Sequence, residues 1–319
     1  MNTSESIDAD AKAIVALDAW KRAGTYNWVL VPQTCDEPII VSVEAKQEGP
    51  VVGRLLFFPG FAAYRDFALL MQAPDMGLAI SRIDVTHWAL VGLKGGGYEL
   101  QTFRAGYAPR LANEPERALL APLIHECLGL MFRFEENPEL PAKYASEQAM
   151  FARQEGLDGK WRDGSYPTPK DPPMPREERI ALGRRECTAA AHLPFAEGEE
   201  WQVDFFGVPA FRTEEPEPRI MYLFAAVDAR TGARCAWDRM SVSTKSNEGL
   251  KPLWESLAQR LLQAILKHGR IPGAVSVRSG RMARFLRPLG LQIPFRIVMH
   301  SKLPALDMTV KGALQSKTI

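Results

Sequence analysis

Apolar side chains in the first 135 residues recur with two different periods, which predict helices and strands respectively. Helical spacing over residues 5–22 predicts an N-terminal helix that ends at Gly24. Alternating apolar runs on either side of Gly-containing turns predict two hairpins. The hairpins pair residues 38–44 with 51–58 and residues 85–93 with 98–103, and helices are expected at 66–72 and from the capping residue Asn113 to about Phe132.

From residue 200 onward the pattern predicts a regular order of elements. Three apolar runs joined by short turns indicate an antiparallel meander, and an amphipathic helix follows them. The predicted strands are 201–211, 220–228, 234–242, 274–277 and 292–299, and the predicted helices are 250–267, 279–289 and 304–314. The predicted order is therefore β-β-β-α-β-α-β-α, which indicates a mixed sheet.

Residues 134–175 contain seven prolines. Proline lacks an N–H donor and is not expected inside a helix or a central strand. We therefore expect an inter-domain linker here, followed by a bridging helix at 176–191. The predicted fold class is α/β: an α+β N-terminal domain with hairpins at 1–135, a Pro-rich linker with the bridging helix at 136–196, and a C-terminal domain at 197–319.

Composition narrows the class of protein. The chain is 46% hydrophobic and 24% charged, as expected of globular proteins, and it holds no apolar run of about 18 residues that would span a membrane. The polar, acidic first ten residues do not resemble a secretory signal. The four cysteines lie far apart without a Cys-x-x-Cys pair, which favours a reducing, cytoplasmic location.

The charge is distributed unevenly, although the whole chain carries a net charge of only +1. Residues 228–319 hold 16 of the 39 basic residues and five of the 38 acidic ones, which leaves an excess of 11 positive charges. The remaining 23 basic and 33 acidic residues give the rest of the chain a charge of −10. A basic end on an acidic body indicates an anionic partner or a contact between the two halves.

Short motifs in the C-terminal half resemble those of a known fold. Trp201-Gln202-Val203-Asp204 resembles the Trp-x-x-Asp that opens the catalytic core of retroviral-type integrases and DDE transposases. The predicted element order is also that of the ribonuclease H-like fold, so the resemblance implies this fold. It argues against the activity, because Arg278 stands where the second catalytic aspartate is expected and no Glu supplies the third carboxylate. Two-metal chemistry needs carboxylates that hold two cations about 3.5–4 Å apart.

The chain as a whole also resembles a bacterial two-domain family of unknown function. In that family a hairpin-rich N-terminal domain precedes a domain with the motifs W-x-x-D-x-F and L-P-x-L-D. Here these are Trp201 to Phe206 and Leu303 to Asp307. The resemblance implies a bacterial protein and carries no established activity.

Asp204, Asp228 and Asp307 are the candidate catalytic or metal-binding carboxylates. If they converge at one edge of the sheet, they form an incomplete site for Mg²⁺ or Mn²⁺. The competing interpretation gives each a structural role. Asp204 is then a hydrogen-bonded strand residue, Asp228 opens the turn before Gly232, and Asp307 lies in the first turn of a helix, where the dipole favours an acid.

A basic stripe is the candidate nucleic-acid interface. Arg278, Arg281, Arg284 and Arg287 recur every three residues, which places three of them on a broad helix face, and Lys267 and Arg270 lie nearby in sequence. Such a stripe suits a phosphate backbone, and Phe285 and Phe295 could stack on bases. The competing interpretation is a solvated helix face with both rings in the core.

We therefore expect a non-catalytic binding protein whose basic C-terminal domain contacts nucleic acid or a protein partner. Two alternatives stay open. One is a metal-dependent nuclease that uses Asp204 and Asp228 with Mg²⁺ or Mn²⁺, and the other is a structural scaffold in which the acidic half covers the basic half. The first hypothesis implies no cofactor. The sequence predicts no oligomeric state and does not separate DNA from RNA.

Overall fold

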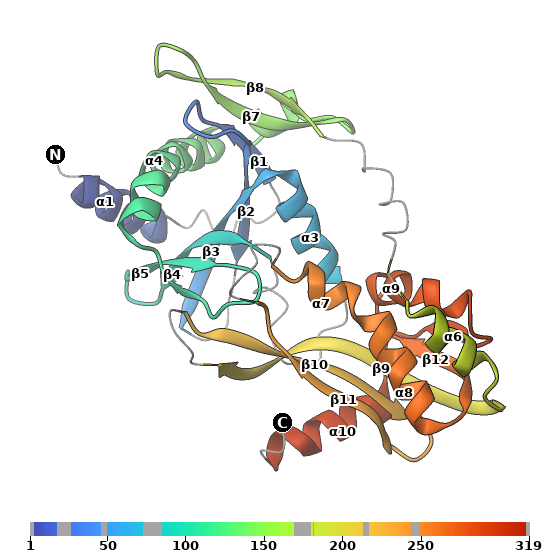
Figure 1. Cartoon of the computed structure of the whole chain (residues 1–319). Coiled ribbons are helices and arrows are strands. Elements are labelled where there is room, and N and C mark those ends of the chain that lie inside the picture. The colour runs from blue at the N-terminus through green and yellow to red at the C-terminus, as the bar shows by residue number, and fades with distance from the viewer. Residues whose placement is uncertain are drawn as a thin grey trace. The chain divides into compact units, whose positions relative to one another are not determined.

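A computed structural model describes residues 3–17, 27–45, 50–72, 85–168, 180, 182–212, 217–243 and 249–316 (Figure 1). The chain forms two compact units. The first comprises Met1–Ala68, Val85–Arg104 and Pro109–Pro172, and the second comprises Leu69–Asp84, Ala105–Ala108 and Pro173–Ile319. Each unit contains one mixed sheet, so the predicted α/β class is confirmed. In the described part of the chain, no helix is long and apolar enough to cross a membrane.

The first unit is built on an eight-stranded sheet in the order β6-β5-β4-β3-β2-β1-β7-β8. Its strands are β1 (Asn27–Val31), β2 (Ile39–Ala45), β3 (Val51–Pro59), β4 (His87–Leu93), β5 (Tyr98–Phe103), β6 (Arg110–Leu111), β7 (Ala149–Glu155) and β8 (Trp161–Pro167). The two predicted hairpins are confirmed as the antiparallel pairs β2–β3 and β4–β5. The parallel pair β1–β7 makes this sheet mixed.

Helices α1 (Thr3–Ala16) and α4 (Glu114–Glu136) share a core with the first sheet, which includes Trp28, Phe57 and Phe151. The predicted cap of α4 is confirmed. The Asn113 side chain accepts a hydrogen bond from the Glu116 N–H at 3.0 Å, and the Glu116 carboxylate accepts one from the Asn113 N–H at 2.8 Å. The helix predicted at 66–72 begins earlier, as α3 (Gly60–Gln72).

The prediction that residues 134–175 form a linker is wrong for most of the segment. Helix α5 (Leu140–Tyr144) and the hairpin β7–β8 occupy it, and β7 pairs with β1 in the first sheet. The prolines do not prevent this, because β8 is an edge strand with proline only at its end. The predicted bridging helix begins later, as α6 (Arg184–Ala191), and residues 169–179 lie outside the described part of the chain.

The second unit contains a five-stranded sheet in the order β11-β10-β9-β12-β13. Its strands are β9 (Phe195–Arg212), β10 (Arg219–Asp228), β11 (Arg234–Met240), β12 (Ile271–Val277) and β13 (Arg296–Met299), and its other helices are α7 (Lys251–Glu255), α8 (Leu257–His268), α9 (Gly280–Gly290) and α10 (Pro304–Gln315). Strands β9, β10 and β11 are antiparallel, as predicted, whereas β12 and β13 run parallel to β9. The predicted order of elements is confirmed, except that the helix predicted at 250–267 is divided into α7 and α8 at Ser256.

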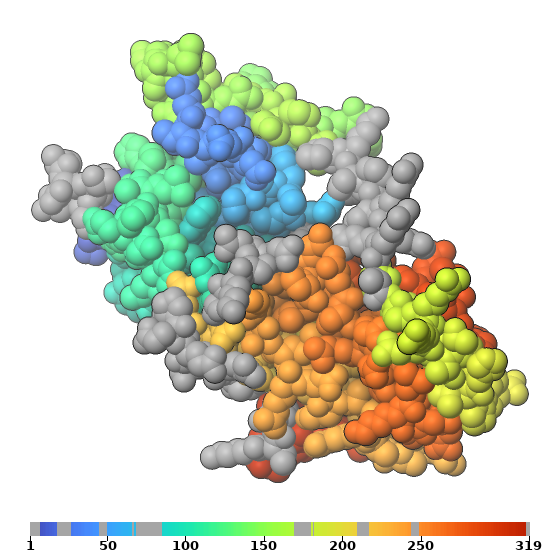
Figure 2. All heavy atoms as spheres, viewed as in Figure 1, coloured from blue at the N-terminus to red at the C-terminus, as the bar shows by residue number. Residues whose placement is uncertain are grey.

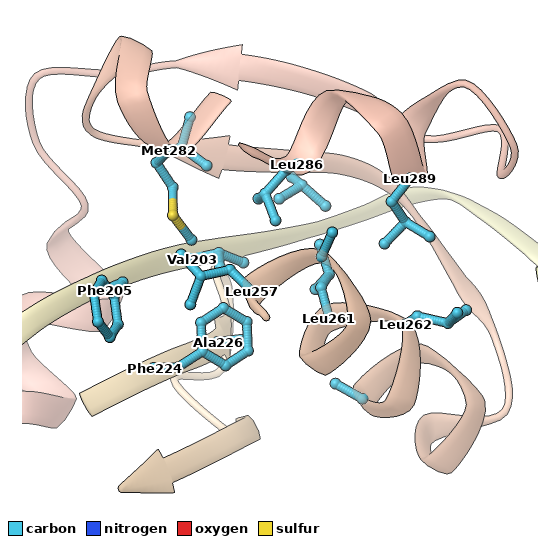
Figure 3. Close-up of a cluster of buried hydrophobic side chains, with 14 of the residues drawn as sticks. Val203, Phe205, Phe224, Ala226, Leu257, Leu261, Leu262, Met282, Leu286 and Leu289 are labelled. Atoms are coloured by element: carbon cyan, nitrogen blue, oxygen red, sulfur yellow. The ribbon is translucent and has the colours of Figure 1, made fainter. Parts of the chain in front are cut away.

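Alternating side chains on the central strands separate the two faces of this sheet. Val203, Phe205, Phe224 and Ala226 pack against apolar side chains of α8 and α9, as Figure 3 shows. On the opposite face, residues such as Leu223 and Ala225 pack against α10. A fully buried leucine stabilises a fold by about 1.5–3 kcal/mol, so these two cores fix the sheet between two helical layers. Polar residues of β9 that lie between Trp201, Val203 and Phe205 therefore point toward the α10 face.

Candidate functional site

Two polar side chains of β9 connect the sheet to the start of α10. The Gln202 side-chain oxygen accepts hydrogen bonds from the backbone N–H groups of Ala305 and Leu306, at 2.9 and 3.0 Å. The first N–H groups of a helix have no partner within the helix, so Gln202 supplies the acceptor that they lack. Two residues further along the same face, Asp204 points toward the same region.

Asp204, Arg278 and Asp307 form a charged bridge, which we call the Arg278 bridge. Arg278 Nε donates to Asp204 Oδ2 at 3.1 Å, and Arg278 Nη2 donates to Asp307 Oδ1 at 2.5 Å. The other Asp204 oxygen accepts a hydrogen bond from the Phe205 N–H. The side chains of Arg278 and Asp204 are only 7% and 11% exposed, whereas that of Asp307 is 38% exposed. One guanidinium thus links β9, the end of β12 and α10.

Burial dominates the titration of Asp204. Removal from water disfavours the charged form and raises the pKa of this carboxyl to about 6, while Arg278 and the Phe205 N–H oppose the increase. Arg278 is therefore the main group that keeps Asp204 ionised near neutral pH. The positive charge that the two carboxylates face is therefore supplied by a side chain of the protein, Arg278.

The three candidate carboxylates do not converge. Asp204 and Asp307 meet at Arg278, but Asp228 pairs with Trp201 across β9 and β10, which places it on the other face of the sheet. Its carboxylate accepts hydrogen bonds from the Thr231 N–H and hydroxyl, both at 2.7 Å, and from the Arg230 N–H at 3.1 Å. Burial acts to raise the pKa of Asp228, but these hydrogen bonds outweigh it and hold the pKa below its ordinary value. The structural interpretation of Asp228 is confirmed.

The described residues contain no group of three or more His, Cys, Asp or Glu side chains placed to hold a metal ion. Asp204 and Asp307, the two candidate carboxylates that come together, are both directed at the Arg278 guanidinium. A cation at this point would have to displace Arg278, with which it would compete for the same two carboxylates.

The prediction that Arg278 belongs to an exposed basic stripe is wrong. Helix α9 begins at Gly280, after the capping residue Ser279, so Arg278 lies at the end of the fully buried strand β12 and not on the helix. Its charge is turned inward, toward Asp204 and Asp307. The helix was predicted to begin at residue 279, so the three-residue spacing alone extended the stripe back to Arg278, which lies before the helix.

The remaining stripe residues lie in different environments. Arg281 and Arg284 are partly buried, and their guanidinium groups lie 4.3 Å from the Trp254 ring centroid and 5.9 Å from that of Phe285. Lys267, Arg270 and Arg287 are exposed, and Arg270 pairs with Glu199 at 2.8 Å. Phe285 and Phe295 pack in the core of the second unit, so their proposed exposure to bases is wrong.

The three exposed residues of the predicted basic stripe lie at one end of the second unit. Helix α8 ends just before β12 begins, and α9 starts just after β12 ends and packs against α8 and β13. The last turns of both helices, which carry Lys267 and Arg287, therefore lie toward the amino end of β12, as does Arg270. We call Lys267, Arg270 and Arg287 the helix-end cluster.

Sequence reasoning identified Arg278 as a departure from the resembled pattern but missed its role as an internal counter-ion. The available signal was that a basic residue stood in place of an expected aspartate in a domain that also held Asp204 and Asp307. Gln202 was missed entirely, because nothing in its local sequence marks it as the cap of a helix about 100 residues later.

Comparisons with known proteins show that part of the chain is similar to one family. No curated protein matches this chain. Residues 189–313 contain all five strands of the second sheet and the whole Arg278 bridge. These residues match the model of a family described as a domain of unknown function, DUF6930, and this part of the chain is similar to that family.

Proposed function

We propose that the C-terminal unit is a ribonuclease H-like domain without catalytic activity, and that it binds nucleic acid through exposed basic side chains. The element order supports the fold assignment, because it is β-β-β-α-β-α-β-α when α7 and α8 are counted as one helical segment. The proposal separates two questions, namely whether the carboxylates can do chemistry and whether the basic surface can hold a polyanion.

The Arg278 bridge is the observation that carries the first part. Phosphoryl transfer in the resembled enzymes needs carboxylates that are free to hold two cations. Here Asp204 is buried and held at 3.1 Å by a guanidinium, and Asp307 is held by the same group. Breaking a buried ion pair on one side costs about 3–5 kcal/mol, which opposes replacement of Arg278 by a metal ion.

The charge distribution supports the second part. Residues 228–319 carry an excess of 11 positive charges. The helix-end cluster places Lys267, Arg270 and Arg287 at the surface. Each phosphate that such residues neutralise releases a condensed counterion, so the affinity should fall steeply as salt rises.

Fluorescence anisotropy of the full chain with labelled single- and double-stranded DNA and RNA, across a salt series, tests this proposal. We expect binding at low salt that is lost as salt increases. The variant Lys267→Glu with Arg287→Glu should weaken binding at least tenfold and lower the salt slope by about 1–2, because each phosphate contact contributes roughly 0.7–0.9. These two residues are chosen over Arg281 and Arg284, whose side chains are partly buried.

A matched control is available in the first unit. Lys94 and Lys160 are exposed in its hairpin turns, and the pair Lys94→Glu with Lys160→Glu changes the net charge by the same amount. This control should bind nearly as well as the unaltered chain. No binding of any nucleic acid at low salt would refute the proposal and leave a protein partner as the next hypothesis. Cleavage that depends on Mg²⁺ or Mn²⁺ and is lost in Asp204→Asn would refute its non-catalytic part.

A further inference from the structure

Strand β11 carries a second set of basic and aromatic residues that the basic stripe did not include. It is the edge strand of the five-stranded sheet and pairs only with β10 among the described residues. Arg234 lies opposite Val227 and Trp237 opposite Ala225, so both side chains share the sheet face that packs against α10. Figure 2 shows amber atoms of this part of the chain at the surface of the second unit.

Arg234 is held over the ring of Trp237. Its guanidinium carbon lies 4.1 Å from the centroid of the indole, and the arginine is exposed. Trp237 is partly buried against the core that joins α10 to the sheet, and its Nε1 atom is buried without a hydrogen-bond partner among the described residues. The ring is thus fixed by packing from behind, and it positions a guanidinium whose other side is open to solvent.

Nearby acidic groups have internal partners, so the outward charge is basic. The Asp228 carboxylate is occupied by its own turn, and Asp238 pairs with Arg260 at 3.2 Å. In the same turn, Arg230 is exposed. The turn lies beside the middle of α10, because the Thr309 hydroxyl donates to the Gly232 carbonyl at 3.2 Å.

We propose that this surface, made of Arg230, Arg234 and Trp237, binds a single-stranded nucleic acid. Arg guanidinium planes and aromatic rings are the groups on which unpaired bases stack. A base would stack on the guanidinium of Arg234, which Trp237 supports from below, while Arg230 contacts a phosphate. In a duplex the faces of the bases are covered by their neighbours, so this mode requires a single strand. The inference rests on the proposed function for its class of partner and adds the site and the strandedness.

Anisotropy of the full chain with a labelled oligothymidine and with a labelled duplex of the same length tests the inference. Arg234→Ala should weaken binding of the single strand at least tenfold and binding of the duplex less than threefold. Arg234→Lys keeps the charge but lacks the planar group, so it should still lose about fivefold on the single strand. Circular dichroism and thermal unfolding should match those of the unaltered chain, because Arg234 is exposed.

The outcomes separate this inference from the function on which it rests. If the unaltered chain binds neither oligonucleotide, the proposed function fails and the inference fails with it. If the chain binds, but Arg234→Ala leaves the affinity for the single strand unchanged while Lys267→Glu with Arg287→Glu reduces it, the inference is overturned and the proposed function stands. Equal losses on both oligonucleotides in Arg234→Ala would overturn the stacking mode.

Discussion

Replacing Arg278 with methionine tests the energetic role of the Arg278 bridge. Methionine keeps an unbranched side chain but removes the guanidinium that lies 3.1 Å from Asp204 and 2.5 Å from Asp307. Two unit charges 3.1 Å apart attract by roughly 5 kcal/mol at an effective dielectric constant of about 20. Loss of one partner from a buried pair destabilises proteins by about 3–5 kcal/mol. We therefore expect Arg278→Met to lose at least about 3 kcal/mol at pH 7.

Part of this loss should disappear in acid. With a pKa of about 6, ionisation of Asp204 stabilises the native state at pH 7 by about 1.4 kcal/mol over its protonated form, and by almost nothing at pH 5. Arg278 lowers the pKa of Asp204, so its removal raises this pKa further and keeps the carboxyl protonated at both pH values. The destabilisation should therefore be about 1.4 kcal/mol smaller at pH 5 than at pH 7.

Urea unfolding of the full chain at pH 5 and pH 7, followed by circular dichroism, measures both quantities. Leu261→Ala is a suitable reference in the same unit, because Leu261 is fully buried and its truncation should cost about 2–5 kcal/mol with no pH dependence. A loss below 1 kcal/mol at pH 7, or the same loss at both pH values, would refute the electrostatic account of the bridge.

Three further predictions concern the titration of Asp204, the cap of α4 and the residue at position 278. Because the pKa of Asp204 is about 6 in the folded chain and about 4 in the unfolded chain, the free energy of unfolding should fall by roughly 3 kcal/mol as pH rises from about 4 to above 6. Thermal unfolding at a series of pH values should show this fall for the unaltered chain and not for Asp204→Asn. The same fall in both proteins would contradict the assignment. Asn113→Ala should cost about 1 kcal/mol in urea unfolding through loss of the α4 cap, whereas no change would show the cap to be dispensable. Arg278→Asp removes the guanidinium and places a third carboxylate beside Asp204 and Asp307. Millimolar Mn²⁺ should therefore raise the melting temperature of this variant and leave that of the unaltered chain unchanged. Equal increases in the two melting temperatures would contradict the account.

Much of the fold follows from local sequence patterns. The two hairpins of the first unit and the meander of the second have strong alternation with turn residues between strands, and all three are confirmed. Helix α8 carries apolar residues at helical spacing and ends at Gly269, which adopts a left-handed conformation with φ of 77°. In these segments, local propensity and tertiary packing favour the same structure.

The errors arise where structure depends on distant partners. Strand β7 was missed because its position is set by the parallel pairing with β1, more than 100 residues earlier, and by the ion pair of Arg153 with Glu126. The strand predicted at 292–299 is shorter, and only 296–299 pair with β12. The linker was predicted from the frequency of proline alone, and this criterion wrongly included the edge strand β8 in an unstructured segment.

The candidate site was predicted in its components but not in its geometry. Asp204, Arg278 and Asp307 were all identified from sequence, yet their bridge depends on the register between β9 and β12 and on the placement of α10. The same limit explains why Arg278 was assigned to the surface. The contact of Arg234 with Trp237 was missed because residues three positions apart lie on opposite faces of a regular strand, and here a register shift brings them to the same face.

One measurement tests the central claim most directly. The full chain is titrated against a labelled single strand over a salt series with Mg²⁺ or Mn²⁺ present, and the strand is then examined for cleavage on a denaturing gel. The account predicts binding that weakens steeply with salt and leaves the strand intact. Absence of binding at low salt, or metal-dependent cleavage that Asp204→Asn abolishes, would contradict it.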